Sequence, residues 1–234
     1  MLPVAILAGG LATRLRPVSE TVPKSMLVVA GKPFVAHQLD WLHGEGVRRV
    51  VLCVGHLGDA IRDAIGDGAS FGLGVEYSFD GEPLLGTGGA LRKAAPMLGR
   101  EFFVLYGDSY IRCSLAAVES AFRRQGKPAL MTVLQNDGRW DRSNVLFRDG
   151  RLVRYDKRTP SPDMRHIDYG LSMLSAGALA SHGEGEAFDL ADLMMDLSRR
   201  SELAGYEATE RFYEIGSPAG LRETEEFFLN RNRI

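Results

Sequence analysis

The stretch that most constrains the fold is residues 4–10, where a short apolar run stops at two consecutive glycines, Gly9 and Gly10. The run is too short for a buried helix and has the texture of a buried strand. The glycines let the backbone turn sharply and approach a ligand closely, and their amides can form an anion-binding nest. This stretch therefore predicts a central strand that leads into an anion site.

Strand and helix patterns alternate after this opening. Continuous apolar strands are indicated at residues 49–54, 75–79 and 101–106, with helices expected at 33–44, 58–65, 115–125 and from a glycine-rich loop at 84–91 to about 98. Such alternation predicts a Rossmann-like α/β fold, with a mixed, mostly parallel sheet and helices on both faces. Ligands of these sheets lie beyond the carboxyl ends of the strands, where both glycine-rich loops and Asp108 would meet.

The pattern changes after a further strand at 129–134. Strands are expected at residues 144–147, 152–155, 167–174, 203–208 and 211–215, with helices at 190–198 and 218–230, the second capped by Ser217. We interpret the strands between 144 and 174 as a small antiparallel addition to the sheet. The whole chain, 1–234, is expected to form one domain, with a nucleotide-binding part at 1–135 and an acceptor part at 136–234.

Composition excludes several functional classes. The formal charge of -2 gives no basic surface for nucleic acid or an anionic membrane, so neither is expected as a partner. The first apolar run has no cationic segment before it and ends at Gly9, which argues against a signal peptide or membrane span and favours a cytoplasmic protein. The two cysteines, Cys53 and Cys113, have no metal-binding spacing, and a buried packing role is expected for both.

The opening loop matches neither common phosphate-binding motif, because G-x-x-x-x-G-K-[ST] and G-x-G-x-x-G are both absent. Two cations follow the glycines instead. The guanidinium of Arg14 suits phosphate oxygens, and Lys24 supplies a compact positive charge. This pattern favours a nucleoside triphosphate whose α-phosphorus is attacked.

The opening loop and the segment after it resemble the signature of a known family. LAGGLATRLRP at residues 7–17, followed by PKSMLVVAGKP at 23–33, is similar to the signature of the sugar-1-phosphate nucleotidylyltransferases, the nucleotide-sugar pyrophosphorylases. The family usually has glycine where Ala12 stands. The resemblance extends over essentially the whole chain and implies transfer of a nucleotidyl group from a nucleoside triphosphate to a sugar 1-phosphate, with release of pyrophosphate.

The resemblance also implies roles for particular residues. Lys24 would stabilise the α-phosphate under attack, Arg14 would bind the β- and γ-phosphates, and Mg²⁺ would be held by Asp108 and Glu214. Glu214 lies in FYEIGSP at residues 212–218, where the family usually has Asp. The residues implied to bind the nucleotide are Leu7, Ala8, Gly9, Gly10, Thr13, Gly86, Thr87 and Gly88.

Departures from the family pattern collect on the sugar side. Asp156-Lys157 resembles a Glu-Lys pair that contacts the sugar and its phosphate, and Asp168 and Gly170 align with a stretch that commonly reads Asn-x-Gly. Asn144 stands where many relatives have glycine. The resemblance implies that these five residues bind the sugar phosphate, and the departures indicate an unusual acceptor.

Several choices stay open at this stage. The loop at residues 82–89 looks most like that of heptose- or mannose-1-phosphate guanylyltransferases, which slightly favours GTP over UTP, although N-acetylmuramate-1-phosphate uridylyltransferases are also similar. The chain could be a monomer or a homodimer. A non-catalytic nucleotide-sugar-binding regulator is the alternative, but binding alone does not need a metal pair. An NAD-dependent oxidoreductase is remote because its fingerprint is missing.

Overall fold

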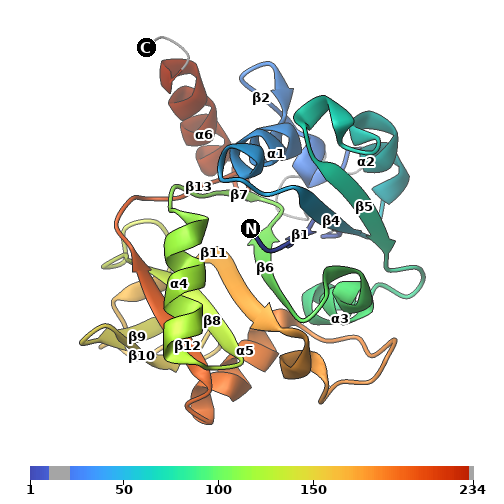
Figure 1. The fold of residues 1–234 in the computed structure, drawn as a ribbon. Coiled ribbons are helices and arrows are strands. Elements are labelled where there is room, and N and C mark those ends of the chain that lie inside the picture. Colours follow the sequence, from blue (N-terminus) through green and yellow to red (C-terminus); the bar gives the residue numbers. More distant parts are fainter. Residues whose placement is uncertain (11–21, 232–234) are drawn as a thin grey trace.

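The computed structural model describes residues 1–10 and 22–231, which build a nine-stranded central sheet (Figure 1). Its middle is parallel: β1 (Val4–Leu7) lies between β4 (Arg49–Val54) and β6 (Glu101–Tyr106), and β5 (Gly74–Phe79) continues the sheet beyond β4. Because these four strands run the same way, the segments that follow each of them meet at one edge. The predicted mixed α/β sheet is confirmed.

The other half of the sheet runs through β11 (His166–Ser175), which pairs antiparallel with β6, β8 and β9. The expected antiparallel addition is therefore confirmed. This half of the sheet also contains β8 (Ala129–Gln135) and the antiparallel pair β9 (Val145–Arg148) and β10 (Arg151–Tyr155). Strand β12 (Leu203–Ala208) pairs parallel with β8.

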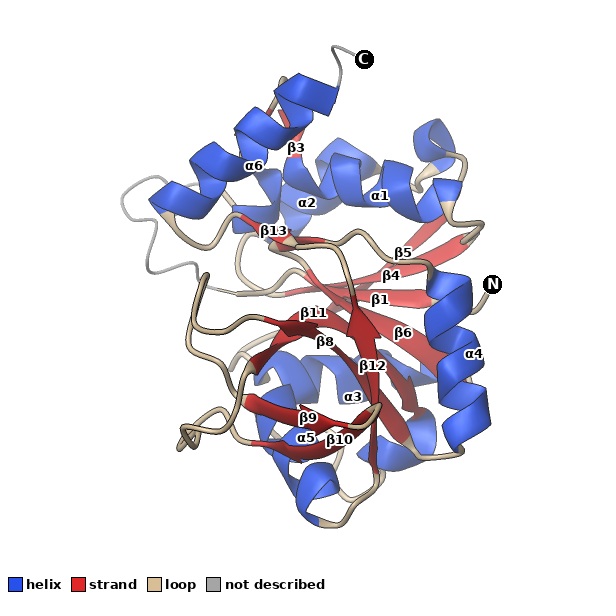
Figure 2. Cartoon of the chain, turned by 90° about the vertical axis from the view of Figure 1, so that its left-hand side faces the viewer, coloured by secondary structure: helices blue, strands red, loops and turns tan. Residues whose placement is uncertain are grey.

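Helices cover both faces of the sheet, as predicted (Figure 2). On one face, α1 (Phe34–Gly44), α2 (Gly58–Ile65) and α4 (Leu115–Gln125) bury residues such as Leu39, Ile61 and Val118 against the strands. On the other face, α3 (Gly86–Leu98) and α5 (Leu190–Arg199) bury Leu91 and Met194. None of the described helices is both long enough and apolar enough to cross a bilayer.

The C-terminal helix α6 (Pro218–Arg231) packs on a separate apolar cluster with α1. Ser217 caps this helix as predicted, because its Oγ accepts a hydrogen bond from the amide of Gly220 at 3.0 Å. Just before it, β13 (Tyr213–Glu214) pairs antiparallel with β7 (Ser109–Tyr110). The expected strand at 211–215 is thus only two residues long, but it ties the end of the chain to the loop after β6.

The helix expected at 33–44 is present as α1 and begins one residue later, at Phe34, because Lys32–Pro33 forms strand β3, which pairs with β2 (Val28–Val29). One local expectation was wrong. Residues 86–89 are not a loop, because they form the first turn of α3. A tight tertiary contact, described below, explains why glycines occupy that turn.

Candidate functional site

The site lies where the parallel strands end. Gly9 follows β1, and a Cβ at this position would come within 2.9 Å of the amide nitrogen of Gly55, which follows β4. Glycine is therefore required at position 9 by the close approach of two strand ends. Gly10 has open space around it, with no atom within 4 Å of an added Cβ. The predicted residues Thr13 and Arg14 lie outside the described part of the chain.

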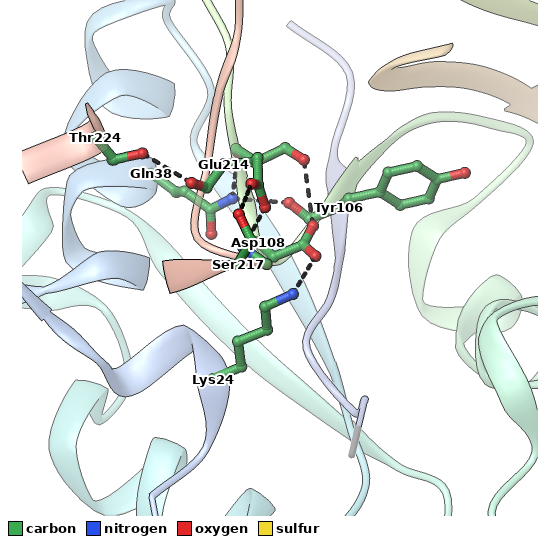
Figure 3. Close-up of polar contacts among 9 residues, drawn as sticks. Lys24, Gln38, Tyr106, Asp108, Glu214, Ser217 and Thr224 are labelled. Carbon is green, nitrogen blue, oxygen red and sulfur yellow. Dashed lines mark hydrogen bonds and ion pairs between the residues drawn. The ribbon is translucent and has the colours of Figure 1, made fainter. Parts of the chain in front are cut away.

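Lys24 and Asp108 form the centre of the described site (Figure 3). Lys24 opens the short 3₁₀ turn η3 (Lys24–Met26), and its Nζ lies 2.6 Å from Asp108 Oδ2, with side chains 20% and 36% exposed. Two residues that the sequence places 84 positions apart are thus joined by an ion pair. The geometry brings a cation and a carboxylate to the edge that the strand pattern predicted.

Glu214 reaches the same place from the C-terminal end of the chain. Strand β13 sets Glu214 opposite Ser109, and the amide of Ile215 donates to the carbonyl of Asp108 at 3.0 Å. A Cβ on Gly216 would lie 3.1 Å from Lys24 Nζ, so the lack of a side chain there leaves room for the lysine. The structure therefore assembles Lys24, Asp108 and Glu214 from three distant segments.

The carboxylate of Glu214 points into its own turn. Its Oε1 accepts from Ser217 Oγ at 2.8 Å, and its Oε2 accepts from the amide of Gly216. Thr224, fully buried on α6, donates to the carbonyl of Glu214 at 2.9 Å and fixes this backbone (Figure 3). In the present arrangement Glu214 supports the start of α6, and a metal-binding role for it stays a prediction.

The donor set has the right chemistry for Mg²⁺. The ion prefers hard oxygen ligands and is commonly held by one or two carboxylates together with substrate phosphates and water. Asp108 and Glu214 are two such carboxylates at one edge of the sheet. Within residues 1–10 and 22–231, no group of three or more candidate protein ligands occurs, so phosphate and water would have to complete the coordination.

A buried glutamine that the sequence analysis missed shapes the loop that carries Asp108. Gln38 of α1 is fully buried, and its Nε2 donates to the carbonyls of Tyr106 and Ser109 at 2.9 and 2.8 Å. These bonds satisfy carbonyl groups at the point where the chain leaves β6. The sequence could have indicated this residue, because a glutamine among the apolar positions of a helix is buried and must form hydrogen bonds with other buried groups.

The glycines at the start of α3 accommodate another segment of the chain. The carbonyl of Phe188 accepts from the amides of Gly88 and Gly89, and the phenyl ring of Phe188 lies where a Cβ on Gly88 would stand. Thr87 Oγ1 donates to Asp189 Oδ1 at 2.7 Å and accepts from the amide of Leu190 at 2.9 Å. Nucleotide-binding roles for Gly86, Thr87 and Gly88 stay predictions, but their packing role is clear.

This packing predicts a loss of stability for Gly88→Ala. Alanine favours a helix over glycine by about 1 kcal/mol, yet its methyl group would overlap the ring of Phe188. Overpacking a tight contact costs roughly 1–3 kcal/mol, so we expect a net decrease in the free energy of unfolding, measured by urea denaturation. Gly44→Ala is the control, because nothing lies within 4 Å of an added Cβ there. Equal stability of both variants would contradict the prediction.

The predicted sugar-side residues also come together. Asn144 lies between two of them: its backbone carbonyl accepts from the amide of Asp156 at 2.9 Å, and its Oδ1 accepts from the amide of Asp168 at 3.2 Å. Gly170 has a φ of +91° and packs against Ser109, next to Asp108. These predicted sugar-side residues therefore adjoin the loop that carries Asp108.

Asp156 is held by its own turn. Its oxygens accept from the amides of Arg158 and Thr159, from Thr159 Oγ1 and from the guanidinium of Arg154. The backbone donor at Thr159, followed by the guanidinium of Arg154, lowers the pKa of Asp156 to about 2. This carboxylate is ionised, and hydrogen bonds within the turn use both of its oxygens. Contact of Asp156 with sugar hydroxyls therefore stays a prediction.

Asp189 connects the two halves of the site. It caps α5 through a bond from the amide of Ala191 at 3.0 Å, accepts from Thr87 of α3, and lies 3.7 Å from Lys157 Nζ. Burial raises the pKa of Asp189, but these donors and the charge of Lys157 lower it by more, so the net pKa is lowered. Sequence reasoning did not single out Asp189, because its contact with Lys157 depends on the tertiary fold.

We expect Asp189→Asn to weaken binding of the predicted acceptor, a sugar 1-phosphate, selectively. The amide still accepts from Ala191 and Thr87 but no longer attracts Lys157, whose ammonium then samples more positions. The KM for the sugar 1-phosphate should rise about 3- to 10-fold with little change in the KM for the nucleotide, given that partly exposed ion pairs contribute ~1 kcal/mol. Asp192→Asn, which removes the partner of Arg158 on the same helix, is the matched control. Equal effects on both KM values would contradict a positioning role.

Comparison with known proteins identifies the family. The profile described as "Nucleotidyl transferase" matches residues 4–140, more than half of the chain. The chain belongs to the nucleotidyl transferase family. Its predicted class, a nucleotidyltransferase enzyme, is confirmed, and the edge that carries Lys24 and Asp108 lies within the matched region.

The alignments of this nucleotidyl transferase with two curated relatives cover different shares of those proteins. It is 34% identical over 160 residues to a glucose-1-phosphate thymidylyltransferase of Streptomyces antibioticus, covering 67% of this chain but only 45% of that protein. It is 26% identical over 214 residues to D-glycero-alpha-D-manno-heptose 1-phosphate guanylyltransferase of Campylobacter jejuni, covering 91% of this chain and 94% of that one. Both agree with the predicted activity class, sugar-1-phosphate nucleotidyltransferase.

A solved structure shows the same fold. HddC from Yersinia pseudotuberculosis, complexed with GMP-PN, aligns with a TM-score of 0.78 and 26% identity over 97% of this chain and 100% of that chain. The similarity extends beyond the profile match into the antiparallel strands and α6. Residues 136–234 of this nucleotidyl transferase therefore have a structural counterpart in a relative of nearly the same length.

Proposed function

We propose that this protein transfers GMP from GTP to a sugar 1-phosphate, with Mg²⁺ bound by Asp108 and Glu214. The observation that carries the proposal is the convergence of Lys24, Asp108 and Glu214 beside the end of β1. A protein that only bound a nucleotide sugar would not need a cation and two carboxylates at this edge. Transfer of a nucleotidyl group requires charge stabilisation and positioning, which these groups supply.

Three cationic residues of the chain would have different roles in the reaction. Lys24, released from Asp108, would place its ammonium against the α-phosphate, where negative charge increases as the sugar phosphate attacks. Arg14 would bind the β- and γ-phosphates and favour departure of pyrophosphate. Lys157 would hold the phosphate of the sugar 1-phosphate. Bound Mg²⁺ would neutralise phosphate charge and help to orient the two reactants.

Two of the relatives and one buried group support guanine over uracil. The heptose guanylyltransferase and HddC both match nearly from end to end. Asp80 follows β5 at the same sheet edge, is 8% exposed, and its Oδ1 has no hydrogen-bond partner among the described residues. A carboxylate matches the adjacent N1–H and N2–H donors of guanine, whereas uracil presents one N–H between two carbonyls.

Pyrophosphate release across ATP, CTP, GTP, UTP and dTTP, each with a panel of sugar 1-phosphates, tests the proposal. Release that requires Mg²⁺ and is fastest with GTP is expected. Faster release with UTP or dTTP would overturn the choice of base but keep the activity. Tight nucleotide-sugar binding without release from any pair would favour a regulatory protein on this fold. We further propose a cytoplasmic enzyme that acts as a monomer or homodimer.

A further inference from the structure

Asp168 differs from the other acidic residues of the sugar side in its surroundings. The register of β11 shifts between Asp168 and Ser172, and the carboxylate of Asp168 contacts Tyr106 at the end of β6. Its Oδ2 accepts from the hydroxyl of Tyr106 at 3.1 Å, and its Oδ1 accepts from the amide of Gly170 at 3.0 Å. Both donors are neutral, and each carboxylate oxygen can accept a further bond.

The cations of this region are matched to other carboxylates. Lys157 lies 3.7 Å from Asp189, while Arg154 binds Asp156 and Arg158 binds Asp192, both over shorter distances. Across residues 1–10 and 22–231, no lysine or arginine forms an ion pair with Asp168. Among the described residues of the acceptor side, Asp168 is therefore a partly buried carboxylate that forms no direct ion pair.

An unbalanced carboxylate in this position restricts what binds beside it. Burial raises the pKa of Asp168, and this effect exceeds the lowering by the hydrogen bonds from Gly170 and Tyr106 and by the positive charge of Lys157, which reflects the cost of holding the carboxylate charge away from water. A ligand ammonium would remove that cost and could donate up to three charge-assisted bonds, whereas a hydroxyl donates one weaker bond. An acetamido group is neutral: it donates one N–H and adds a carbonyl oxygen that an acceptor-only carboxylate repels.

We propose that the sugar 1-phosphate used by this protein carries a free amino group, and that Asp168 selects it. This inference rests on the proposed function, because it assigns the acceptor of the same reaction. Lys157 would bind the phosphate end of the acceptor and Asp168 its amino end. Asp168 would thus be a specificity-determining residue, in a position where an amide would accept neutral sugars.

The test compares hexose 1-phosphates that differ at one ring carbon by a hydroxyl, an amino or an acetamido group. With saturating GTP and Mg²⁺, we expect kcat/KM for one amino sugar to exceed that of its hydroxyl and acetamido counterparts by about 10-fold or more. Asp168→Asn should reduce the value for that amino sugar about 10- to 100-fold and change the hydroxyl form less than threefold. Such ratios correspond to ~1.4 kcal/mol per factor of ten.

Two further variants separate selectivity from folding. Tyr106→Phe removes one neutral hydrogen bond but keeps the carboxylate, so the amino preference should persist even if both rates fall. Asp163→Asn makes the same substitution at an exposed residue paired with Arg148, and it should leave the preference unchanged. If Asp168→Asn does not fold, as judged by its thermal unfolding, the wild-type panel decides the question alone.

The failures of the two proposals are distinguishable. Wild-type turnover of hydroxyl or acetamido forms that equals or exceeds the amino form at every ring position would overturn the inference and leave the nucleotidyltransferase reaction standing. An equal effect of Asp168→Asn on charged and neutral acceptors would do the same. Absence of pyrophosphate release with all acceptors and nucleotides would instead overturn the proposed function.

Discussion

Replacing Lys24 with methionine should lower kcat/KM for the sugar-nucleotide reaction about 100- to 1,000-fold. Methionine has a similar length but no charge, so the variant removes the ammonium that would stabilise the attacked α-phosphate. Losing one preorganised stabilising group of this kind typically costs a factor of this size. The measurement is pyrophosphate release with GTP and the best acceptor, at saturating Mg²⁺.

Lys32→Met is the matched control. Lys32 also pairs with an aspartate, Asp40, but on an exposed surface, with its side chain 40% accessible. Surface pairs contribute ~1 kcal/mol or less, so this variant should keep activity within about twofold of the wild type. Full turnover by Lys24→Met would remove Lys24 from the mechanism.

The Lys24–Asp108 ion pair adds a second readout. The ammonium contacts Oδ2 of Asp108, the residue that would hold Mg²⁺, so lysine and metal would compete for this carboxylate in the resting protein. Without Lys24, Mg²⁺ should bind the resting protein about two- to fivefold more tightly, as expected for a partly exposed pair worth ~0.5–1 kcal/mol. Lower turnover combined with tighter metal binding, measured by calorimetric titration, would distinguish this mechanism from simple misfolding.

The most accurate sequence predictions concern helices and strands that are determined by local residue patterns. Strand β4, and helices α2 and α4, occur at the predicted residues, because continuous apolar or amphipathic runs end there at glycines or polar turns. Right-handed crossovers between parallel strands then bring the end of β1 and Asp108 to one edge. The convergence of Lys24 with Asp108 needed this topology together with the family resemblance.

Features that depend on distant segments were not predictable. The glycines at 86–89 have the composition of a loop, but they open a helix whose surface receives Phe188, about a hundred positions later. Nothing near them in the sequence indicates that partner. Asp189 likewise joins Thr87 to Lys157 only after α3 and α5 have packed on the same face.

Asp156 shows a different limit. Its resemblance to a family carboxylate suggested a sugar ligand, while its neighbours Arg158 and Thr159 form a turn that uses both carboxylate oxygens. An aspartate that accepts from amides two and three residues ahead is a common turn former. The local chemistry therefore competes with the functional interpretation, and geometry is needed to see that Asp168 is the less occupied acid.

Replacing Asp108 with asparagine should have the other large effect. The amide keeps the size of the side chain and its bond from Ser109 but loses the charge that would hold Mg²⁺. We expect kcat to fall about 100-fold or more, with half-maximal activity shifted to at least ~10-fold higher Mg²⁺, because Glu214 and the phosphates would have to hold the ion without it. Rates measured over a Mg²⁺ titration give both values.

The controls for this variant separate charge, metal and folding. Asp40→Asn removes the carboxylate of the surface pair with Lys32 and should leave the Mg²⁺ dependence unchanged. The free energy of unfolding of Asp108→Asn should lie within about 1 kcal/mol of the wild-type value, since the ion pair that the substitution breaks is partly exposed. An unchanged Mg²⁺ midpoint in Asp108→Asn would remove Asp108 as a metal ligand. Because Glu214 already bonds Ser217, that result would leave Lys24 with Asp108 as a purely electrostatic pair at the end of β1.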